Sequence, residues 1–157
     1  DYHTNSNFID FIFKKFPECK LAAFRIYIFA ENHNMENLKH IRVLVVQDNR
    51  IRSFVIEKFL REVEAIITVA INGKVAVELC SSREFDIILM NIQMPVMDGF
   101  EATREIRKFN KVIPIIAETN YGNIRDRCLE EGFNDYIRNP FSKEELIGIL
   151  KKHLKEK

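Results

Sequence analysis

The stretch Asp86-Ile-Ile-Leu-Met-Asn-Ile-Gln-Met-Pro-Val-Met-Asp-Gly99 decides the fold of this chain. Its first part is a run of large apolar residues, which suits a strand buried on both faces. That run delivers the polar side chain of Asn91 to its C-terminal end. A Met-Pro loop follows, and a segment with helical spacing extends from about Gly99 to Phe109. A buried strand that passes through a short loop into a helix is typical of an α/β protein.

The same alternation continues on both sides of this stretch. Runs rich in apolar residues at 41–46, 65–70, 113–117 and 134–138 predict four more strands. Gly132 is placed to end a helix, and Ser142 and Glu145 form a capping box that opens the last one. Apolar residues at helical spacing mark three of the helices: Ile51, Val55, Phe59 and Leu60; Ile124, Cys128 and Leu129; Leu146, Ile147, Leu150 and Leu154.

Five strand–helix units with short connections predict parallel strands, right-handed crossovers and helices on both faces of one sheet. Periodicity therefore reaches the doubly wound α/β class. In such folds the ligands lie at the carboxyl ends of the strands. The polar residues that follow each predicted strand are accordingly the candidates for a functional site.

Residues 41–155 resemble the receiver domain of two-component response regulators and hybrid histidine kinases. The resemblance is carried by Met94-Pro95 with Asp98-Gly99, by Asp135-Tyr136 and by Pro140-Phe141, all at the separations of a receiver. It implies the flavodoxin-like (βα)5 fold with strand order 2-1-3-4-5, and a cis peptide between Asn139 and Pro140. The stretch 94–107 is especially similar to receivers of hybrid kinases.

The resemblance also implies a phosphoacceptor pocket, in which this chain departs from the receiver pattern. An aspartate would accept the phosphoryl group where Asn91 stands, and a lysine would stand at Asn139. Thr119 keeps the usual hydroxyl residue, and Asn120 is bulkier than the small residue usual there. An amide nitrogen is a poor nucleophile because its lone pair is delocalised. We therefore expect no phosphotransfer at this site, and no enzymatic activity.

The metal ligands implied by the resemblance are depleted as well. The acidic pair that helps to hold Mg²⁺ reads Gln47-Asp48, and the backbone of Gln93 would be a further oxygen ligand. Mg²⁺ prefers anionic oxygen, so we expect weak Mg²⁺ binding at most, with Asp48 and Gln93 as residual candidates, and no cofactor.

Plainer roles stay open at each pocket position. Asp48 could cap the helix that follows it, and Thr119 could pack at a strand end. Asn91 can both donate and accept, so it could satisfy Gln47 or Asp48 within a hydrogen-bonded pocket.

The expected function is that of a pseudo-receiver, a regulatory protein–protein interaction module in two-component signal transduction. Its expected partner is a histidine kinase, a phosphotransfer protein or another receiver. Thr119, Tyr136 and Phe141 are the expected switch and contact residues, although Tyr136 could be plain core. Two alternatives are the C-terminal receiver-like part of a hybrid histidine kinase that regulates its catalytic domains, and an active receiver blocked by an Asp-to-Asn substitution.

Composition excludes several other classes of protein. A net charge of +1 gives no reason to expect nucleic acid or an anionic membrane surface as partner. Neither the three cysteines nor the four histidines form a metal-ligand pattern, and Cys128 falls on the apolar face of a predicted helix. No apolar run approaches the roughly 20 residues that span a bilayer. We expect a cytoplasmic protein with free, buried thiols.

Residues 1–40 are expected to form an N-terminal helix and strand extension with a linker, before a receiver-like domain at 41–157. The segment contains six of the thirteen phenylalanines. Phe8, Phe11 and Phe16 would share one helix surface, and residues 21–30 read as a strand on which Phe24, Ile26 and Ile28 point inward. The segment would pack on the receiver-like body, on a second copy in a homodimer, or on a domain outside this chain. Because the chain opens on Asp1, we expect it to be part of a longer protein.

Overall fold

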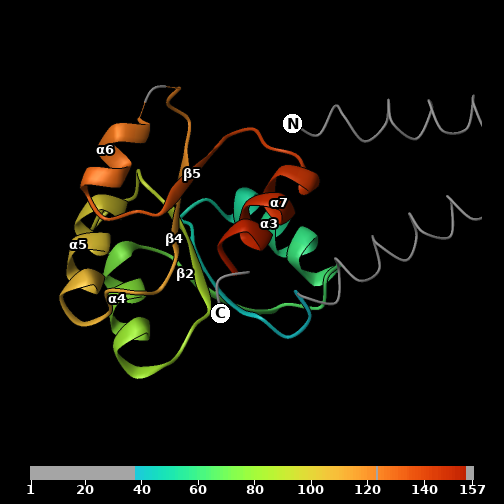
Figure 1. Cartoon of the computed structure of the whole chain (residues 1–157), viewed down its shortest axis with the longest axis horizontal. Coiled ribbons are helices and arrows are strands. Elements are labelled where there is room, and N and C mark those ends of the chain that lie inside the picture. The colour runs from blue at the N-terminus through green and yellow to red at the C-terminus, as the bar shows by residue number, and fades with distance from the viewer. Residues whose placement is uncertain (1–37, 123, 155–157) are drawn as a thin grey trace, which may run out of the picture. The chain divides into compact units, whose positions relative to one another are not determined.

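The structure is a computed structural model that describes residues 38–122 and 124–154. Within these ranges strands and helices alternate along the chain (Figure 1). The strands are β1 (Arg42–Val46), β2 (Ile66–Ala70), β3 (Ile87–Asn91), β4 (Ile115–Thr119) and β5 (Asp135–Arg138). The helices are α3 (Arg50–Arg61), α4 (Gly73–Ser82), α5 (Gly99–Phe109), α6 (Arg125–Glu130) and α7 (Lys143–Leu154).

The strands form one parallel sheet in the order β2-β1-β3-β4-β5. This confirms the flavodoxin-like fold and its strand order. The chain moves outward from β1 to β2 on one side and through β3, β4 and β5 on the other. The connections that follow β1 and β3 therefore leave opposite faces of the sheet, which opens a crevice at the carboxyl ends of these two strands.

Each face of the sheet carries its own apolar core. Helices α4, α5 and α6 cover one face, and α3 and α7 cover the other (Figure 1). In β3 the alternation is complete, since Ile88 and Met90 belong to the first core while Ile87 and Leu89 belong to the second. A strand covered on both faces has no solvent side, which is why the run before Asn91 is uninterrupted in its apolar character.

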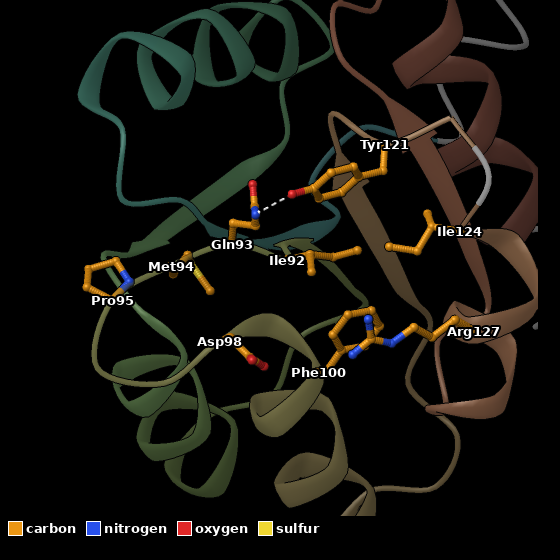
Figure 2. A pocket seen from close by; sticks show the side chains of 9 residues that line it. All are labelled: Ile92, Gln93, Met94, Pro95, Asp98, Phe100, Tyr121, Ile124 and Arg127. Atoms are coloured by element: carbon orange, nitrogen blue, oxygen red, sulfur yellow. Dashed lines mark hydrogen bonds between the residues drawn. The ribbon is translucent and has the colours of Figure 1, made fainter.

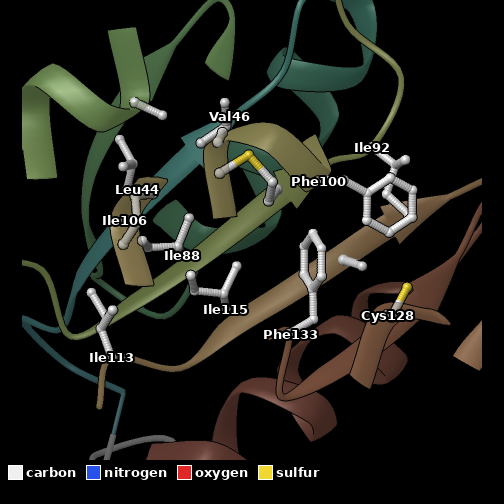
Figure 3. Close-up of a cluster of buried hydrophobic side chains, with 14 of the residues drawn as sticks. Leu44, Val46, Ile88, Ile92, Phe100, Ile106, Ile113, Ile115, Cys128 and Phe133 are labelled. Atoms are coloured by element: carbon white, nitrogen blue, oxygen red, sulfur yellow. The ribbon is translucent and has the colours of Figure 1, made fainter. Parts of the chain in front are cut away.

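The first core is built around aromatic and branched side chains (Figure 3). Phe100 and Phe133 meet edge to face, with ring centroids 5.8 Å apart. Cys128 is buried beside them, as its helical spacing predicts. Burial raises the pKa of the Cys128 thiol, and it raises the pKa of the half-buried Cys80 to about 11. These two cysteines, which lie in the described part of the chain, are free thiols.

The start of α7 and the end of α6 lie where the sequence predicted them. The Ser142 backbone N–H donates to the Glu145 carboxylate at 2.7 Å, and the Glu145 N–H donates to Ser142 Oγ at 3.1 Å. This is the predicted capping box at the start of α7. Gly132 has φ +94° just after α6, a left-handed conformation that glycine adopts without a steric cost.

The predicted inner face of α3 is partly wrong. Leu60 is buried as expected, but Ile51 is 77% exposed and Val55 is 41% exposed. The helix carries a second apolar set, in which Ile56 replaces them in the core. Ile51, Val55 and the exposed Phe54 lie three and four positions apart, so they share one outward side of α3. We call these three residues the α3 patch.

The predictions for residues 1–37 lie outside the described residues. Leu38, the first described residue, has no exposed surface and packs in the core beneath α3 and α7. In the part of the chain that the structure describes, no helix is both long enough and apolar enough to cross a membrane.

Candidate functional site

The pocket residues predicted from the sequence lie together at the carboxyl end of the sheet. Gln47 and Asp48 directly follow β1, Asn91 ends β3, and Thr119 ends β4. Asn139 directly follows β5. Neighbouring parallel strands end at the same edge, so residues far apart in the sequence meet there.

The side-chain amide of Asn91 forms the centre of this site. Its Nδ2 atom donates to Gln47 Oε1 at 3.1 Å, to Asp48 Oδ1 at 3.0 Å and to the Gln93 carbonyl at 2.9 Å. Asn91 is buried, so these bonds replace the water that its NH₂ group would otherwise bind. The prediction that Asn91 could satisfy Gln47 or Asp48 is confirmed for both residues.

Gln47 links Asn91 to the next layer of the pocket. Its Oε1 accepts from Asn91 and from the backbone N–H of Asn49 at 3.1 Å. Its Nε2 donates to Glu118 Oε2 at 2.9 Å. The amide therefore uses both of its ends, and these partners fix its orientation.

Glu118 is the site residue that sequence analysis missed. It is the penultimate residue of β4 and is 1% exposed. Its Oε1 accepts from Asn139 Nδ2 at 2.8 Å, while Oε2 accepts from Gln47. Gln47 stands where a receiver would have an acid, and Asn139 stands where it would have a lysine. Both neutral amides thus donate to the carboxylate of Glu118.

Burial sets the ionisation of Glu118. It raises the pKa of this carboxyl above its usual range, and the amides of Asn139 and Gln47 offset part of that rise. Arg52 also lowers the pKa of Glu118, whereas Asp48 raises it. A sequence signal existed, because a glutamate inside an otherwise apolar strand covered on both faces requires buried hydrogen-bond partners.

Thr119 and Gln93 connect the pocket to its rim. Thr119 Oγ1 accepts from the backbone N–H of Tyr121 at 3.0 Å. The Tyr121 hydroxyl in turn accepts from Gln93 Nε2 at 2.8 Å (Figure 2). Gln93 therefore contacts Asn91 in the pocket through its backbone carbonyl, and it contacts Tyr121 at the edge of the pocket through its side chain.

A cavity of about 220 Å³ lies over these residues, and Asp48, Arg52, Asn91, Glu118 and Thr119 are among those that line it. The donor set does not fit Mg²⁺. The Asn91 NH₂ group already faces the three oxygens of Gln47, Asp48 and Gln93, which a cation would need. The described residues contain no group of three or more acidic, histidine or cysteine side chains that could hold a metal ion.

The alternative prediction that Asp48 caps the helix after β1 is wrong. The N-cap of α3 is Asn49, whose side chain accepts from the backbone N–H groups of Ile51 at 3.0 Å and Arg52 at 3.1 Å. Asp48 Oδ1 instead accepts from Asn91. The residue that caps a helix is the last one with extended backbone before it, and here that residue lies one position further on.

The predicted contact residues Tyr136 and Phe141 lie on β5 and in the segment after it. Tyr136 is half-buried against the first core, and Phe141 is half-buried against the second. The peptide between Asn139 and Pro140 is cis, as predicted. Neither aromatic side chain is fully buried, so the expectation that they contact a partner stays a prediction.

Comparison with known proteins gives a consistent family. Residues 43–151 match the response regulator receiver domain family. The chain is 34% identical over 132 residues to the transcription factor SKN7 of Saccharomyces cerevisiae, which covers 82% of this chain and 21% of SKN7. The chain thus spans about a fifth of this relative.

Two solved structures share both fold and sequence with the chain. One is the receiver domain of the sensor histidine kinase PA1611 from Pseudomonas aeruginosa with a magnesium ion in its active-site cleft; the TM-score is 0.71 at 38% identity, over 74% of this chain and 99% of that one. The other is the receiver domain of Ssk1 in complex with the histidine phosphotransfer protein Ypd1, both from Saccharomyces cerevisiae. Its TM-score is 0.65 at 30% identity, over 69% of this chain and 84% of that one.

Proposed function

The chain belongs to the response regulator receiver domain family of two-component signalling, and we propose that it is a pseudo-receiver that cannot be phosphorylated. In this proposal it is not an enzyme but a regulatory module that acts by binding other proteins. The observation that carries the proposal is the Asn91 amide, which donates to three oxygens at the position of the phosphoacceptor.

The chemistry of the pocket supports the loss of phosphotransfer. Phosphoryl transfer depends on a nucleophile, on its alignment and on positive charge near the phosphoryl oxygens. Asn91 supplies no nucleophile, and its NH₂ group is directed at acceptors within the pocket. Asn139 supplies no cation, and its amide is used by Glu118.

The test is intact-mass measurement after incubation with acetyl phosphate and Mg²⁺. We expect the wild-type chain to keep its mass, and an acid-labile phosphate adduct would refute the proposal. Asn91→Asp alone is expected to be phosphorylated weakly at most, because Gln47 and Asn139 still lack charge. The positive control carries Gln47→Glu, Asn91→Asp, Glu118→Leu and Asn139→Lys together. If Asn91→Asp alone is phosphorylated normally, the chain is a blocked form of an active receiver.

The partner class that the comparisons support best is a histidine phosphotransfer protein, since Ypd1 binds the similar Ssk1 receiver. The α3 patch is a suitable contact surface. It exposes Ile51, Phe54 and Val55 on the helix that begins beside the pocket. Apolar side chains grouped on one exposed helix face mark interaction surfaces more often than isolated ones do.

Binding to a purified histidine phosphotransfer protein, measured by titration calorimetry, tests this contact. Phe54→Ser should weaken binding about tenfold or more, because large aromatic side chains dominate such interfaces. Val112→Ser is the matched control, since Val112 is also exposed but precedes β4 at the opposite end of the sheet. Equal binding by both variants would exclude the α3 patch and favour a contact through Tyr136 on β5 or Phe141 after it.

A second candidate function is favoured by the similarity to the receiver of a sensor histidine kinase. In it the chain is the receiver-like part of a hybrid kinase and regulates the catalytic domains of the same protein. The protein sequence that precedes Asp1 decides between the two, because a hybrid kinase would place an ATP-binding domain there.

A further inference from the structure

A second and larger hollow lies beside the pocket. What it could bind does not depend on whether the pocket accepts a phosphoryl group. Its volume is about 790 Å³, and it lies between the loop that joins β3 to α5 and the start of α6 (Figure 2). We call it the α5–α6 groove. Its floor consists of Ile92, Phe100 and Ile124, three apolar side chains that are almost fully buried. Its size lies within the range of roughly 300–1,000 Å³ that is usual for small-molecule sites.

One cation stands over this apolar floor. The guanidinium carbon of Arg127 lies 4.2 Å from the centroid of the Phe100 ring. Arg127 forms no salt bridge with any carboxylate in the described ranges. Its neighbour Arg104 pairs with Glu131, and Arg107 donates to the Gly132 carbonyl and to Asn134. Arg127 therefore keeps its donors for a ligand.

Three other polar side chains, those of Gln93, Tyr121 and Asp98, line the groove. Gln93 and Tyr121, joined by their hydrogen bond, form the side of the groove next to the pocket (Figure 2). Asp98 also lines the groove, but its Oδ1 caps α5 by accepting from the Glu101 backbone N–H at 2.8 Å. The positive end of α5 thus offsets part of the charge of Asp98.

We propose that the α5–α6 groove binds a small organic carboxylate with an apolar body. The carboxylate pairs with the planar guanidinium of Arg127, which can donate two parallel hydrogen bonds to it. The apolar body covers Ile92, Phe100 and Ile124. Compact inorganic anions would make no contact with these apolar side chains, so they would gain only the pairing with Arg127.

Such a ligand would lie against the residue that also reaches the pocket. The Gln93 side chain borders the groove, while its backbone carbonyl accepts from Asn91. A ligand that displaces the bond between Gln93 and Tyr121 would change the loop that supplies one of the three acceptors of Asn91.

The experiment is a titration of the full chain, labelled with ¹⁵N, with 3-phenylpropionate as the carboxylate probe and 3-phenylpropan-1-ol as its neutral counterpart. Amide resonances of residues 92–100 and 124–127 should shift in a saturable way with the carboxylate, and the alcohol should bind more weakly. Arg127→Gln should weaken carboxylate binding about tenfold, the loss expected for a charge-assisted pair, and leave alcohol binding unchanged. Arg125→Gln is the matched control, because Arg125 is exposed on the same helix and does not line the groove.

Three results would overturn the proposal. The first is an absence of saturable shifts with the carboxylate in the millimolar range. The second is equal weakening by Arg125→Gln, which would mean a general charge effect. The third is unchanged carboxylate binding in Arg127→Gln. Arg127 is on the surface, so circular dichroism of the variant should match the wild type and exclude unfolding as the cause.

Discussion

Amide orientation is the property on which the pocket depends at the scale of single residues. A side-chain amide has one donor end and one acceptor end, so a neighbour of the wrong kind leaves a buried group unsatisfied. In Gln47 the acceptor end faces Asn91 and the donor end faces Glu118. Asn139 donates to the second oxygen of the same carboxylate. The two amides therefore favour the ionised form of Glu118, and they offset part of the rise in its pKa that burial causes.

Asn91→Asp should destabilise the chain at pH 7. The substitution removes the donor to three oxygens and places a second carboxylate next to Asp48. We expect a loss of about 1–3 kcal/mol in the free energy of unfolding, measured by urea titration. Asn120→Asp adds the same charge at the exposed mouth of the cavity without removing a described hydrogen bond, so it should change stability little. Equal losses in both variants would mean that charge alone matters.

Substitutions of Glu118 should separate its shape from its charge. Glu118→Gln keeps the shape, and a flip of the Asn139 amide would supply the acceptor that the new NH₂ group needs. Glu118→Leu leaves Gln47 Nε2 buried without an acceptor, so it should be about 1–3 kcal/mol less stable than Glu118→Gln in urea unfolding. Equal stability of the two would show that the amides find other partners.

Glu118 also predicts a pH dependence. Burial raises its folded pKa, so the folded chain binds more protons than the unfolded chain once the pH exceeds the usual glutamate value of about 4.3. The wild type therefore loses stability from this group as pH rises from there through the folded pKa. The stability of Glu118→Gln relative to wild type should rise with pH over the same window, by urea unfolding at several pH values. A constant difference would contradict this.

The sequence predicted the pocket positions but not their hydrogen bonds. Each strand end is recognisable from a local apolar run, and the parallel topology then brings Gln47, Asn91 and Thr119 to one edge. The partners of Glu118 are 71 and 21 residues away along the chain. Which of several polar groups meet across that distance depends on side-chain directions at the ends of the strands, and no local pattern contains that information.

At the scale of elements, helix α5 begins unusually close to strand β3. A Cβ atom on Gly99 would lie 2.4 Å from the Asn91 carbonyl oxygen and 2.8 Å from the Ile92 Cα, both backbone atoms. The Gly99 N–H also donates to the Ile92 carbonyl at 2.8 Å. Glycine at this position lets the helix start against the loop that holds the pocket.

Gly99→Ala should therefore destabilise the chain even though alanine favours helices. The backbone of the loop has to move to accept the methyl group, and overpacking of this kind costs about 1–3 kcal/mol. The thermal midpoint, measured by circular dichroism, should fall. Gly122→Ala is the control, since its Cβ would meet only the side chain of Arg138, at 3.4 Å or beyond. A tolerated Gly99→Ala would mean that the loop is free to shift.

The existence of α3 could be predicted from sequence, but its inner face could not be fixed. Its apolar residues form two sets at helical spacing, one with Ile51 and Val55 and one with Ile56 and Leu60. Periodicity identifies a helix from either set. Which set is buried depends on how α3 is rotated about its axis when it packs on the sheet. That rotation is a property of the assembled fold.

At the scale of the whole molecule, one sheet is shared by both cores. Strand β3 contributes Met90 to one core and Leu89 to the other. A substitution that destabilises one core should therefore also destabilise the other, because both cores depend on the same strand. We therefore expect residues 38–154 to unfold as one cooperative unit.

Amide hydrogen exchange of Leu89→Ala tests this cooperativity. A buried Leu-to-Ala change costs about 2–5 kcal/mol. The most protected amides of α5, on the other face of the sheet, should lose protection by the same free energy as those of α7. Val112→Ala, at an exposed site, should leave both unchanged. Loss of protection limited to α7 would show that the two faces unfold separately.

The carboxylate of Glu118 also limits how this chain could change by single mutations. Gln47→Glu would set a second carboxylate against it, where a donor now stands. Asn139→Lys would pair with Glu118 instead of a phosphoryl group. Asn91→Asp would place a carboxylate directly beside that of Asp48, where a donor now stands. We therefore expect each of these single substitutions toward the receiver pattern to be harmful or without benefit until the glutamate is also replaced. The hydrogen bonds of the pocket are thus expected to constrain the order in which its residues can be exchanged, with Glu118 first.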